Sequence, residues 1–196
     1  MQPFTSKPAH RNGLPVTGQT TVYVTGDNGT NQAGVAHRYE IKNTGQYSGT
    51  TAIVLNGKTD THTNAVVIDH AFRVMYSQAV SGSVGPTSNG LLPWTTNGSG
   101  EGVFSYIDAA NAASVGGHND WRCPTDQEVY AIRDMEAPLG VPDATAFPAW
   151  ASGSFVWSST TRPNATTNAM QVGGGSGIES PVVKTGTTYV ALIRSI

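Results

Sequence analysis

Apolar and polar residues alternate along much of this chain, with the two-residue period of a half-buried strand. Ala36 to Lys42 inserts a tyrosine and an isoleucine among charged and polar neighbours, and Thr51 to Leu55 is a second such run. Asn56–Gly57, directly after that run, is a favoured hairpin turn. Thr21 to Thr25 alternates valine with tyrosine ahead of an Asp-Asn-Gly turn signal. The pattern therefore predicts three short strands in the N-terminal third.

A helical period replaces this alternation farther along the chain. Between residues 129 and 135 an apolar residue recurs every three positions, so these side chains share one face of a helix. Thr125 stands at the N-cap position, and Glu128 follows three residues later, which completes the pattern of a capping box. We expect this helix to cover residues 126–135.

The other elements follow from the same two periods and from turn residues. Residues 1–20 hold three prolines and no apolar period, and we expect an irregular arm. Residues 81–100 are rich in glycine, serine and asparagine, which predicts a long surface loop that carries Trp94. A first helix is predicted at about residues 104–113, and further strands at 66–76, 154–160, 167–172, 181–184 and 187–194.

The composition limits the kinds of partner and site. With 196 residues the chain has room for one full domain and an extension, or for two small units. A formal net charge of −2 argues against nucleic acid, which selects a basic face. The single cysteine, Cys123, excludes an intrachain disulfide and a zinc site built from cysteines, and we expect it in the core. We expect no membrane insertion, because no apolar run approaches roughly 18 residues.

Five segments stand in the order of a known domain. Trp121 to Glu136, WRCPTDQEVYAIRDME, resembles the W-R-x-P-T-x-x-E-L signature of C-type-lectin-like domains, found at the C-terminal end of bacterial collagen-like adhesins and in many phage proteins. Phe155 to Thr161 resembles the W-S-S-T strand of that family, and Tyr189 to Arg194 its closing strand. Val67 to Tyr76 is similar to its opening strand, and Phe104 to Ala113 to its first helix.

The resemblance implies an α+β fold of the C-type-lectin-like class, with a mixed sheet, two helices and long loops, preceded by a β-rich N-terminal extension. Residues 1–65 would form an arm and a small attachment region, and residues 66–196 the lectin-like domain. The structural signature would consist of Trp121, Arg122, Thr125, Glu128, Trp157 and Ser158. The chain departs from the family where Cys123 replaces a leucine, where Tyr76 replaces a tryptophan, and where the closing strand lacks its first arginine.

We expect no enzymatic activity. The PTDQE segment is also similar to a stretch of formylglycine-generating enzymes, which share the lectin-like fold, but those oxidases need two cysteines for copper and this chain has one. The five histidines are scattered, with no pair at the i, i+4 spacing of a metal-binding helix. Ser158 and Ser159 lie in an expected core strand, outside any Gly-x-Ser-x-Gly elbow. We therefore predict no catalytic residue, no metal and no cofactor.

Candidate ligand-binding residues gather around the W-S-S-T strand. Aromatic faces stack on sugars or peptides, while arginine and amide groups supply directed hydrogen bonds. The residues that offer these groups are Trp150, Arg162, Asn164, Asn168 and Gln171. In the alternative interpretation, Trp150 covers the core and the polar residues only solvate a loop.

Three functions fit these observations. The first is a phage virion protein, in a tail fibre or as capsid decoration, whose lectin-like module binds a host-surface glycan or protein receptor. Its N-terminal region would hold other virion proteins, and the lack of an apolar secretion signal in residues 1–8 agrees with release by lysis. The second is an adhesin on the bacterial cell surface that binds host glycans. The third is a retroelement-diversified phage ligand-binding protein. The adhesin resemblance also implies a homotrimer.

Overall fold

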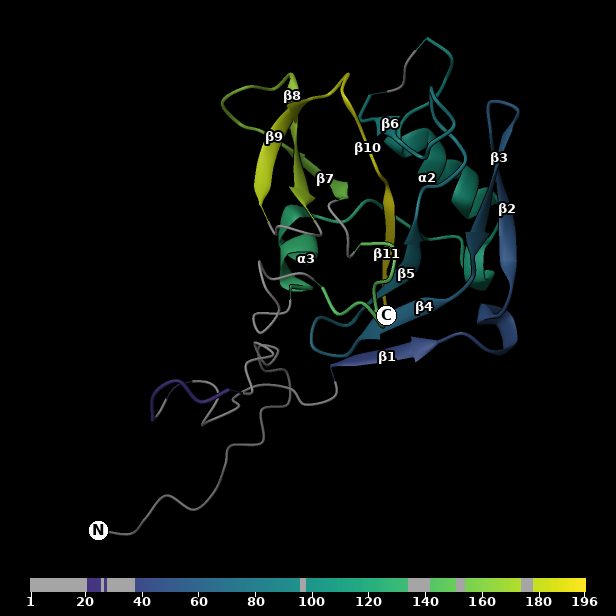
Figure 1. Cartoon of the computed structure of the whole chain (residues 1–196). Coiled ribbons are helices and arrows are strands. Elements are labelled where there is room, and N and C mark those ends of the chain that lie inside the picture. Colours follow the sequence, from purple (N-terminus) through teal and green to yellow (C-terminus); the bar gives the residue numbers. More distant parts are fainter. Residues whose placement is uncertain are drawn as a thin grey trace.

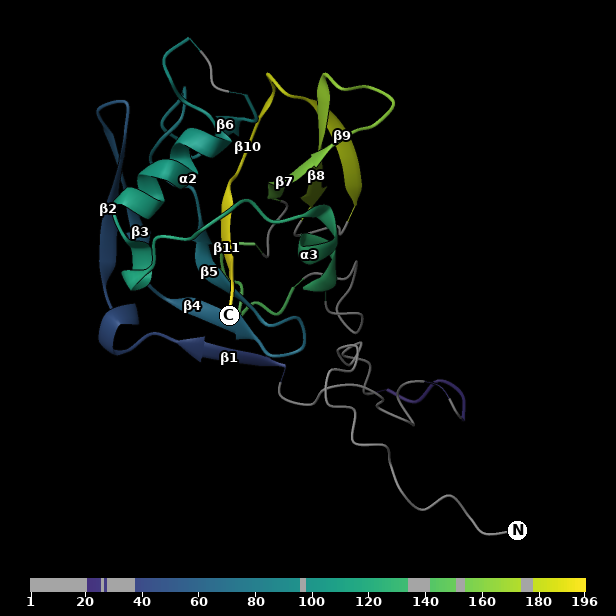
Figure 2. The same ribbon diagram turned by 180° about the vertical axis from the view of Figure 1, so that it is seen from behind.

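The computed structural model describes residues 21–25, 27, 38–95, 98–133, 142–150, 154–173 and 178–196. Over these residues the protein is a mixed α+β structure with two helices and several antiparallel sheets, and its N-terminal part is rich in strands (Figures 1 and 2). The arm expected at residues 1–20 lies outside the described residues. Within the described ranges, no helix is long and apolar enough to cross a membrane.

Four antiparallel strands form the central sheet in the order β1-β4-β5-β11. They are β1 (Tyr39–Lys42), β4 (Val66–Asp69), β5 (Val74–Val80) and β11 (Ala191–Ser195). The prediction of a single strand over residues 66–76 is wrong, because the chain turns back after Asp69. The Asp69 Oδ1 accepts hydrogen bonds from the N–H groups of Ala71 at 2.9 Å and Phe72 at 3.2 Å, and these bonds fix the turn between β4 and β5.

The hairpin of β2 (Thr50–Leu55) and β3 (Lys58–Thr63) confirms the predicted strand and turn. Asn56 and Gly57 have positive φ angles of 51° and 74°, as the central residues of a type I′ turn require. β1 was also predicted, and it joins the central sheet beside β4. Residues 39–63, which the sequence assigned to an attachment region, therefore pack with the elements that follow them.

Thr21 to Thr25 does not form the predicted strand. The segment is bent, because the Asp27 carboxylate accepts hydrogen bonds from the N–H groups of Tyr23 at 2.9 Å and Val24 at 3.1 Å. A strand also needs a neighbour that bonds its backbone, and no described strand pairs with this segment. The local preference of valine and tyrosine for strands is therefore not sufficient here.

The two helices begin where the sequence predicts them. α2 (Val103–Ala112) confirms the first helix and packs against β2. α3 (Asp126–Ala131) has Thr125 as its N-cap, as predicted, but is shorter than expected. It ends at Ala131, and residues 134 and 135, which the prediction included, lie outside the described residues.

A three-stranded antiparallel sheet follows in the order β7-β8-β9. Its strands, β7 (Phe155–Thr161), β8 (Asn168–Gly173) and β9 (Glu179–Val183), lie close to their predicted positions. The strand predicted at 187–194 is instead divided between β11 and the short β10 (Thr187–Thr188), which pairs with β6 (Leu92–Pro93). Two 3₁₀ turns are also present, η1 (Gly45–Tyr47) and η2 (Val115–Gly117).

Two hydrophobic clusters cover the two faces of the central sheet. Along β4, Val66 belongs to the first cluster and Val67 to the second, as the alternation of side chains in a strand requires. Trp121 and Trp157 lie in the first cluster with 3% and 0% of their surface exposed. Cys123 is buried in the same cluster, which confirms its expected place in the core.

Candidate functional site

Arg122, Thr125 and Glu128 form one bonded group at the start of α3. The Glu128 carboxylate accepts the N–H of Thr125 at 2.8 Å and two N–H groups of Arg122 at 2.8 and 2.6 Å. Thr125 Oγ1 accepts the N–H of Glu128 at 3.2 Å, which completes the predicted capping box. Burial acts to raise the pKa of Glu128, but the bonds from Arg122 and Thr125 outweigh it and lower that pKa. This group fixes the position of α3.

The other signature residues join β7 to its surroundings. Trp157 donates from Nε1 to the Leu92 carbonyl at 2.7 Å, which ties β7 to β6. Ser158 donates from Oγ to the Met170 carbonyl of β8 at 3.0 Å. Trp121 donates from Nε1 to a carbonyl of η2 at 3.0 Å. Each of these polar groups is satisfied inside the scaffold, as buried polar groups usually are.

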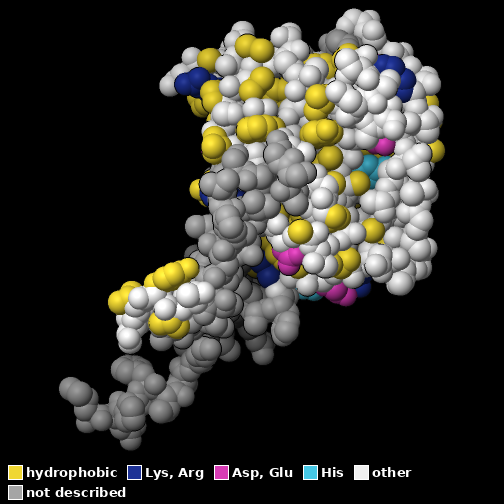
Figure 3. All heavy atoms as spheres, in the orientation of Figure 1, with side chains coloured by type: hydrophobic (Ala, Val, Ile, Leu, Met, Phe, Trp, Pro, Cys, Tyr) yellow, Lys and Arg dark blue, Asp and Glu magenta, His cyan; other side chains and the backbone are white. Residues whose placement is uncertain are grey.

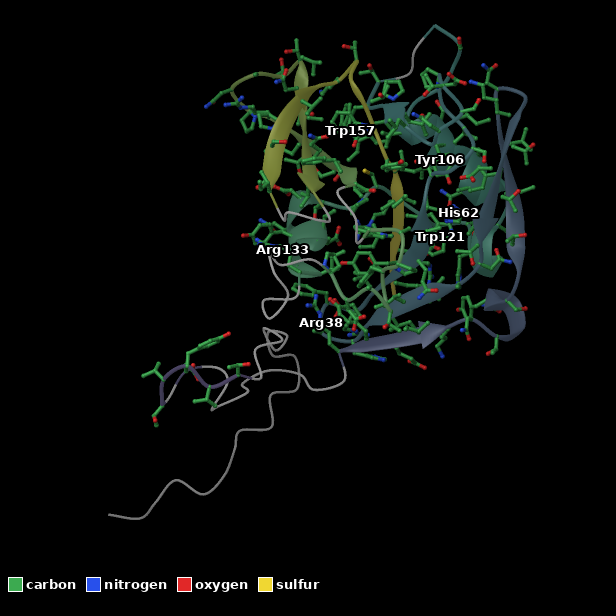
Figure 4. The ribbon with its side chains drawn as sticks, viewed as in Figure 1. Arg38, His62, Tyr106, Trp121, Arg133 and Trp157 are labelled. Atoms are coloured by element: carbon green, nitrogen blue, oxygen red, sulfur yellow. The ribbon has the colours of Figure 1, made fainter. Side chains whose placement is uncertain are left out.

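An open groove lies between the β7-β8-β9 sheet and β10. We define this sheet groove by the residues that line it, which are Leu91, Ser154, Phe155, Gln171, Val182, Thr187, Thr188 and Tyr189. Its volume is about 510 Å³, within the usual range for a small-ligand site. Trp157 of β7 is fully buried (Figure 4) and bonds the carbonyl of Leu92, which pairs with Thr188 of β10, so the groove lies next to a rigid part of the core.

Phe155 and Tyr189 supply the aromatic surface of the sheet groove. The Phe155 carbonyl accepts a hydrogen bond from Thr188 Oγ1 at 2.7 Å and another from the Tyr189 N–H at 3.2 Å. These bonds hold the start of β7 against the segment after β10. Both residues are half-buried and line the groove, and the Tyr189 side chain also packs against the second cluster. Rings held in this way can stack on an apolar ligand face with little loss of conformational entropy.

Gln171 supplies a directed polar group to the sheet groove. It stands opposite Ser180 across β8 and β9, and its Nε2 donates to the Ser180 Oγ at 3.1 Å. This bond orients the amide, and no described residue bonds the amide oxygen. An amide oxygen of this kind can accept a hydrogen bond from a ligand hydroxyl or N–H group.

The sheet groove contains no lysine, arginine, aspartate, glutamate or histidine among its lining residues. In Figure 3, hydrophobic side chains gather over β7, β9 and β10, and charged side chains are sparse there. The polar lining consists of hydroxyl groups and one amide. This chemistry suits an uncharged ligand that has both apolar faces and hydroxyl groups.

Trp150, a candidate from the sequence, does not offer a stacking face. Its side chain is fully buried in the second cluster, with its ring centroid 6.2 Å from that of Tyr76 and 5.6 Å from that of Phe147. The expectation of an exposed Trp150 is therefore wrong, and the alternative, that it covers the core, describes the structure. Burial of so large an apolar surface is strongly favourable, which explains its position.

The structure separates the four remaining candidates. Arg162 and Asn164 are exposed in the turn between β7 and β8, and Asn168 begins β8. Gln171, farther along β8, is the only candidate that lines the sheet groove. The turn keeps its shape through main-chain bonds, from the Arg162 N–H to the Asn168 carbonyl at 3.0 Å and from the Asn168 N–H to the Ala165 carbonyl at 2.8 Å.

Sequence reasoning missed the two aromatic residues of the sheet groove. Phe155 stands two positions before the core residue Trp157, so strand alternation places both side chains on the same face of β7. The sequence therefore held a signal for Phe155. It held none for Tyr189, because the place of Tyr189 depends on the parallel bridge between Val156 and Tyr189, which joins residues distant in the chain.

A second hollow lies on the side of the β7-β8-β9 sheet that packs against α3. Asp126, Gln127, Tyr130, Ala131 and Glu179 line it. Burial and the neighbouring Asp126 carboxylate raise the pKa of Glu179. Calcium takes six to eight oxygen ligands, so two carboxylates make a poor site. In the part of the chain that the structure describes, no group of three or more His, Cys, Asp or Glu side chains could hold a metal.

A serine, a histidine and an aspartate also meet, but inside the core. His62 Nε2 lies 2.7 Å from Ser77 Oγ, and His62 Nδ1 lies 3.1 Å from the Tyr106 hydroxyl, which donates to Asp60 Oδ2 at 2.7 Å (Figure 4). We call these four residues the buried polar chain. None exposes more than 4% of its surface, so a substrate cannot reach the serine. The arrangement therefore stabilises the fold.

Comparison with known proteins agrees with this arrangement. A family model described as the Lcl C-terminal domain matches residues 65–194, from β4 into β11. The matched range includes the signature residues and the whole sheet groove. This family is found in bacterial collagen-like proteins, as the sequence resemblance implied. No curated protein matches the chain.

Proposed function

Since the chain belongs to the Lcl C-terminal domain family, we propose that it is a recognition module that binds an uncharged glycan in the sheet groove. The observation that carries this proposal is the lining of the groove, where two half-buried aromatic residues and an oriented amide stand among hydroxyl groups without a charged side chain. Rings stack on the apolar faces of sugars, and amides bond sugar hydroxyl groups. The module holds its ligand and leaves it chemically unchanged.

Two observations support binding rather than catalysis. The buried polar chain keeps its serine away from solvent, so it offers no accessible nucleophile. Burial raises the pKa of the Cys123 thiol to about 12, which keeps the thiol protonated near neutral pH. The side chains of the sheet groove itself are suited to hydrogen bonding and stacking.

The proposal also includes the particle or surface that displays the module. A chain with 23 glycines and only 12% charged residues has the composition of a fibre protein, which supports a phage virion as the carrier. Membership of a family found in bacterial collagen-like proteins supports the bacterial surface as the alternative. Mass spectrometry of purified virions and of isolated cell envelopes decides between them, since the chain should be enriched in only one of the two preparations.

The glycan proposal is tested with an array of neutral and sulfated oligosaccharides. We expect the purified chain to bind neutral oligosaccharides and to keep that binding when salt is raised, because salt screens only charged contacts. Tyr189→Ala and Gln171→Ala should each weaken the affinity about tenfold, which corresponds to about 1.4 kcal/mol. Calorimetry with the best neutral probe measures this loss.

The matched control is Tyr130→Ala, which removes an equally polar aromatic ring from the second hollow. It should bind the neutral probe as tightly as the unchanged chain does. Binding of sulfated probes alone would contradict the proposal. Equal affinities of the Tyr189 and Gln171 variants and the unchanged chain would also contradict it, once circular dichroism shows that all of them are folded.

A further inference from the structure

The strand β2 has an open edge. Leu55 and Lys58 flank the two-residue turn of the hairpin, so the odd-numbered residues of β2 direct their main-chain groups to β3. The N–H and C=O groups of Thr50, Ala52 and Val54 therefore point to the other side. No described strand pairs with that side, and Figures 1 and 2 show β2 at the outer boundary of the domain.

This edge lacks the features that usually protect an exposed strand. Natural edge strands are short, carry lysine or proline, or contain a bulge. β2 is a six-residue strand, TTAIVL, without a charged residue or a proline, and its register with β3 is continuous. Other edge strands differ, because β1 carries Glu40 and Lys42, β9 carries Pro181, and main-chain bonds with Tyr189 cover the edge of β7. The open edge of β2 is therefore suited to pairing.

We propose that β2 pairs with β2 of a second copy of this chain, antiparallel about a twofold axis. The outward main-chain groups set the register, which places Ala52 opposite its own counterpart and Thr50 opposite Val54. Every such pair exchanges two N–H···O bonds, because each of these residues directs both groups to the partner. The two hairpins then form one continuous sheet in the order β3-β2-β2-β3.

The side chains on the exposed face of β2 are compatible with this pairing. Thr50, Ala52 and Val54 are uncharged and exposed, so no like charges meet across the axis. The smallest of them, Ala52, lies at the axis, where two copies approach most closely. Val54 has 58% of its surface exposed in the single chain, and the Thr50 of the second copy covers part of it. The two copies of β2 are therefore complementary in their side chains as well as in their main-chain hydrogen bonds.

A twofold axis limits the assembly to two chains. Both copies use the same edge, so the contact closes both edges and leaves none for a third chain. This differs from the homotrimer that the adhesin resemblance implies. The sheet groove lies on other strands, β7 to β10, so glycan binding and pairing can be measured independently.

Light scattering over a range of concentrations tests the pairing. The unchanged chain should reach the mass of two chains as its concentration rises. Ala52→Lys places two ammonium groups opposite each other at the axis, and Ala52→Pro removes an outward N–H without removing a bond to β3. Both variants should remain monomeric and should keep the far-ultraviolet spectrum of the unchanged chain. Thr61→Lys is the matched control, because Thr61 is the exposed neighbour of Ala52 on β3 and should leave the dimer intact.

A cysteine at the axis gives a second, direct test. Residues in a hydrogen-bonded antiparallel pair have Cα atoms about 5.5 Å apart, a separation that a disulfide can bridge. Mild oxidation should therefore convert Ala52→Cys into a covalent dimer and leave Thr61→Cys monomeric. The buried Cys123 should not interfere.

Three results would overturn the proposal. The first is an unchanged chain that stays monomeric at every concentration, and the second is a trimer whose mass Ala52→Lys does not alter. The third is a stable oligomer in which Ala52→Cys does not cross-link. A monomeric Ala52→Lys variant that still binds the neutral oligosaccharide probe would separate this proposal from the proposed function.

Discussion

The hydroxyl group of Tyr106 donates a 2.7 Å hydrogen bond to Oδ2 of Asp60 and lies 3.1 Å from Nδ1 of His62, so one phenol joins α2 to two positions of β3. Asp60 also accepts the N–H of Gly82 at 2.9 Å. Gly82 begins the loop that leads to Leu91 on the wall of the sheet groove. The buried polar chain therefore also anchors the start of this loop.

Removal of the Tyr106 hydroxyl should destabilise the fold. Tyr106→Phe leaves the carboxylate of Asp60 and the imidazole of His62 each without one buried partner, and we expect a loss of about 1–3 kcal/mol in the free energy of unfolding. Urea denaturation measures this loss. Tyr130→Phe removes the same hydroxyl from a half-exposed ring and should change the free energy by less than about 0.5 kcal/mol. Equal stabilities of the two variants would contradict the role of the buried polar chain.

Stability should fall in acid partly because of Asp60. Burial acts to raise the pKa of Asp60, but His62, the Tyr106 hydroxyl and the Gly82 N–H outweigh burial and lower it. The folded pKa then lies below the unfolded value of about 3.9, so the unfolded state takes up the proton first. The contribution of Asp60 is complete above the unfolded pKa and is lost as the pH falls through the folded pKa.

Denaturation at a series of pH values checks this dependence. Asp60→Asn should be less stable than the unchanged chain near neutral pH, and its stability should depend less on pH between about pH 5 and pH 2. Glu179 supplies the contrast, because its pKa is raised and its contribution is lost as the pH rises. Glu179→Gln should therefore change the dependence of stability on pH in the direction opposite to Asp60→Asn. The change should be small, because Glu179 is exposed. A profile of Asp60→Asn parallel to that of the unchanged chain would exclude this assignment.

The thiol of Cys123 should be unreactive in the folded protein. Burial raises its pKa to about 12, and its Sγ lies 3.6 Å from the Trp157 carbonyl. A disulfide reagent added near neutral pH should release one thiol equivalent only when denaturant unfolds the chain. Thr61→Cys adds a thiol at an exposed position of β3, away from the open edge of β2, and that thiol should react at once. Rapid labelling of the unchanged native chain would show that this part of the core opens frequently.

The capping box should contribute measurably to stability. Thr125→Ala removes the bond to the N–H of Glu128 and should cost about 1 kcal/mol. Glu128→Ala should cost more, because it also removes the bond to the Thr125 N–H and the two bonds from Arg122. The ion pair itself adds no more than about 1 kcal/mol, since Arg122 is 40% exposed. Thermal denaturation of both variants gives the order, and the reverse order would contradict this account.

The sequence predicted elements well where the signal is local. Asn56–Gly57 determines a hairpin turn by its own backbone preferences, and Thr125 with Glu128 determines a helix start by bonds within one turn. Thr21 to Thr25 shows the limit of such signals. Its residues favour a strand, but the bonds that would stabilise one come from another strand, and the Asp27 carboxylate bends the segment instead.

The candidate site was harder to predict, because it depends on contacts between distant segments. Phe155 and Tyr189 meet through the Phe155 carbonyl, which two residues of a later segment bond. Trp150 was expected at the surface for its ring chemistry, although its burial depends on packing against Tyr76 of β5. Gln171 was chosen for its amide chemistry and its position close to the loop after the W-S-S-T strand, and the structure places it in β8, where it lines the sheet groove. Contacts with residues distant in the chain therefore determine whether Phe155, Tyr189 and Trp150 lie at the groove or in the core.

The turn from Arg162 to Asn168 is held by its own main chain, so the identity of its side chains has little effect on folding. Such a turn tolerates replacement, and relatives of this protein could acquire new surface chemistry there through point changes alone. It is also a practical place for an epitope tag or a fluorescent label. A label attached there would allow the protein to be detected while the sheet groove and the β2 edge stay free to bind.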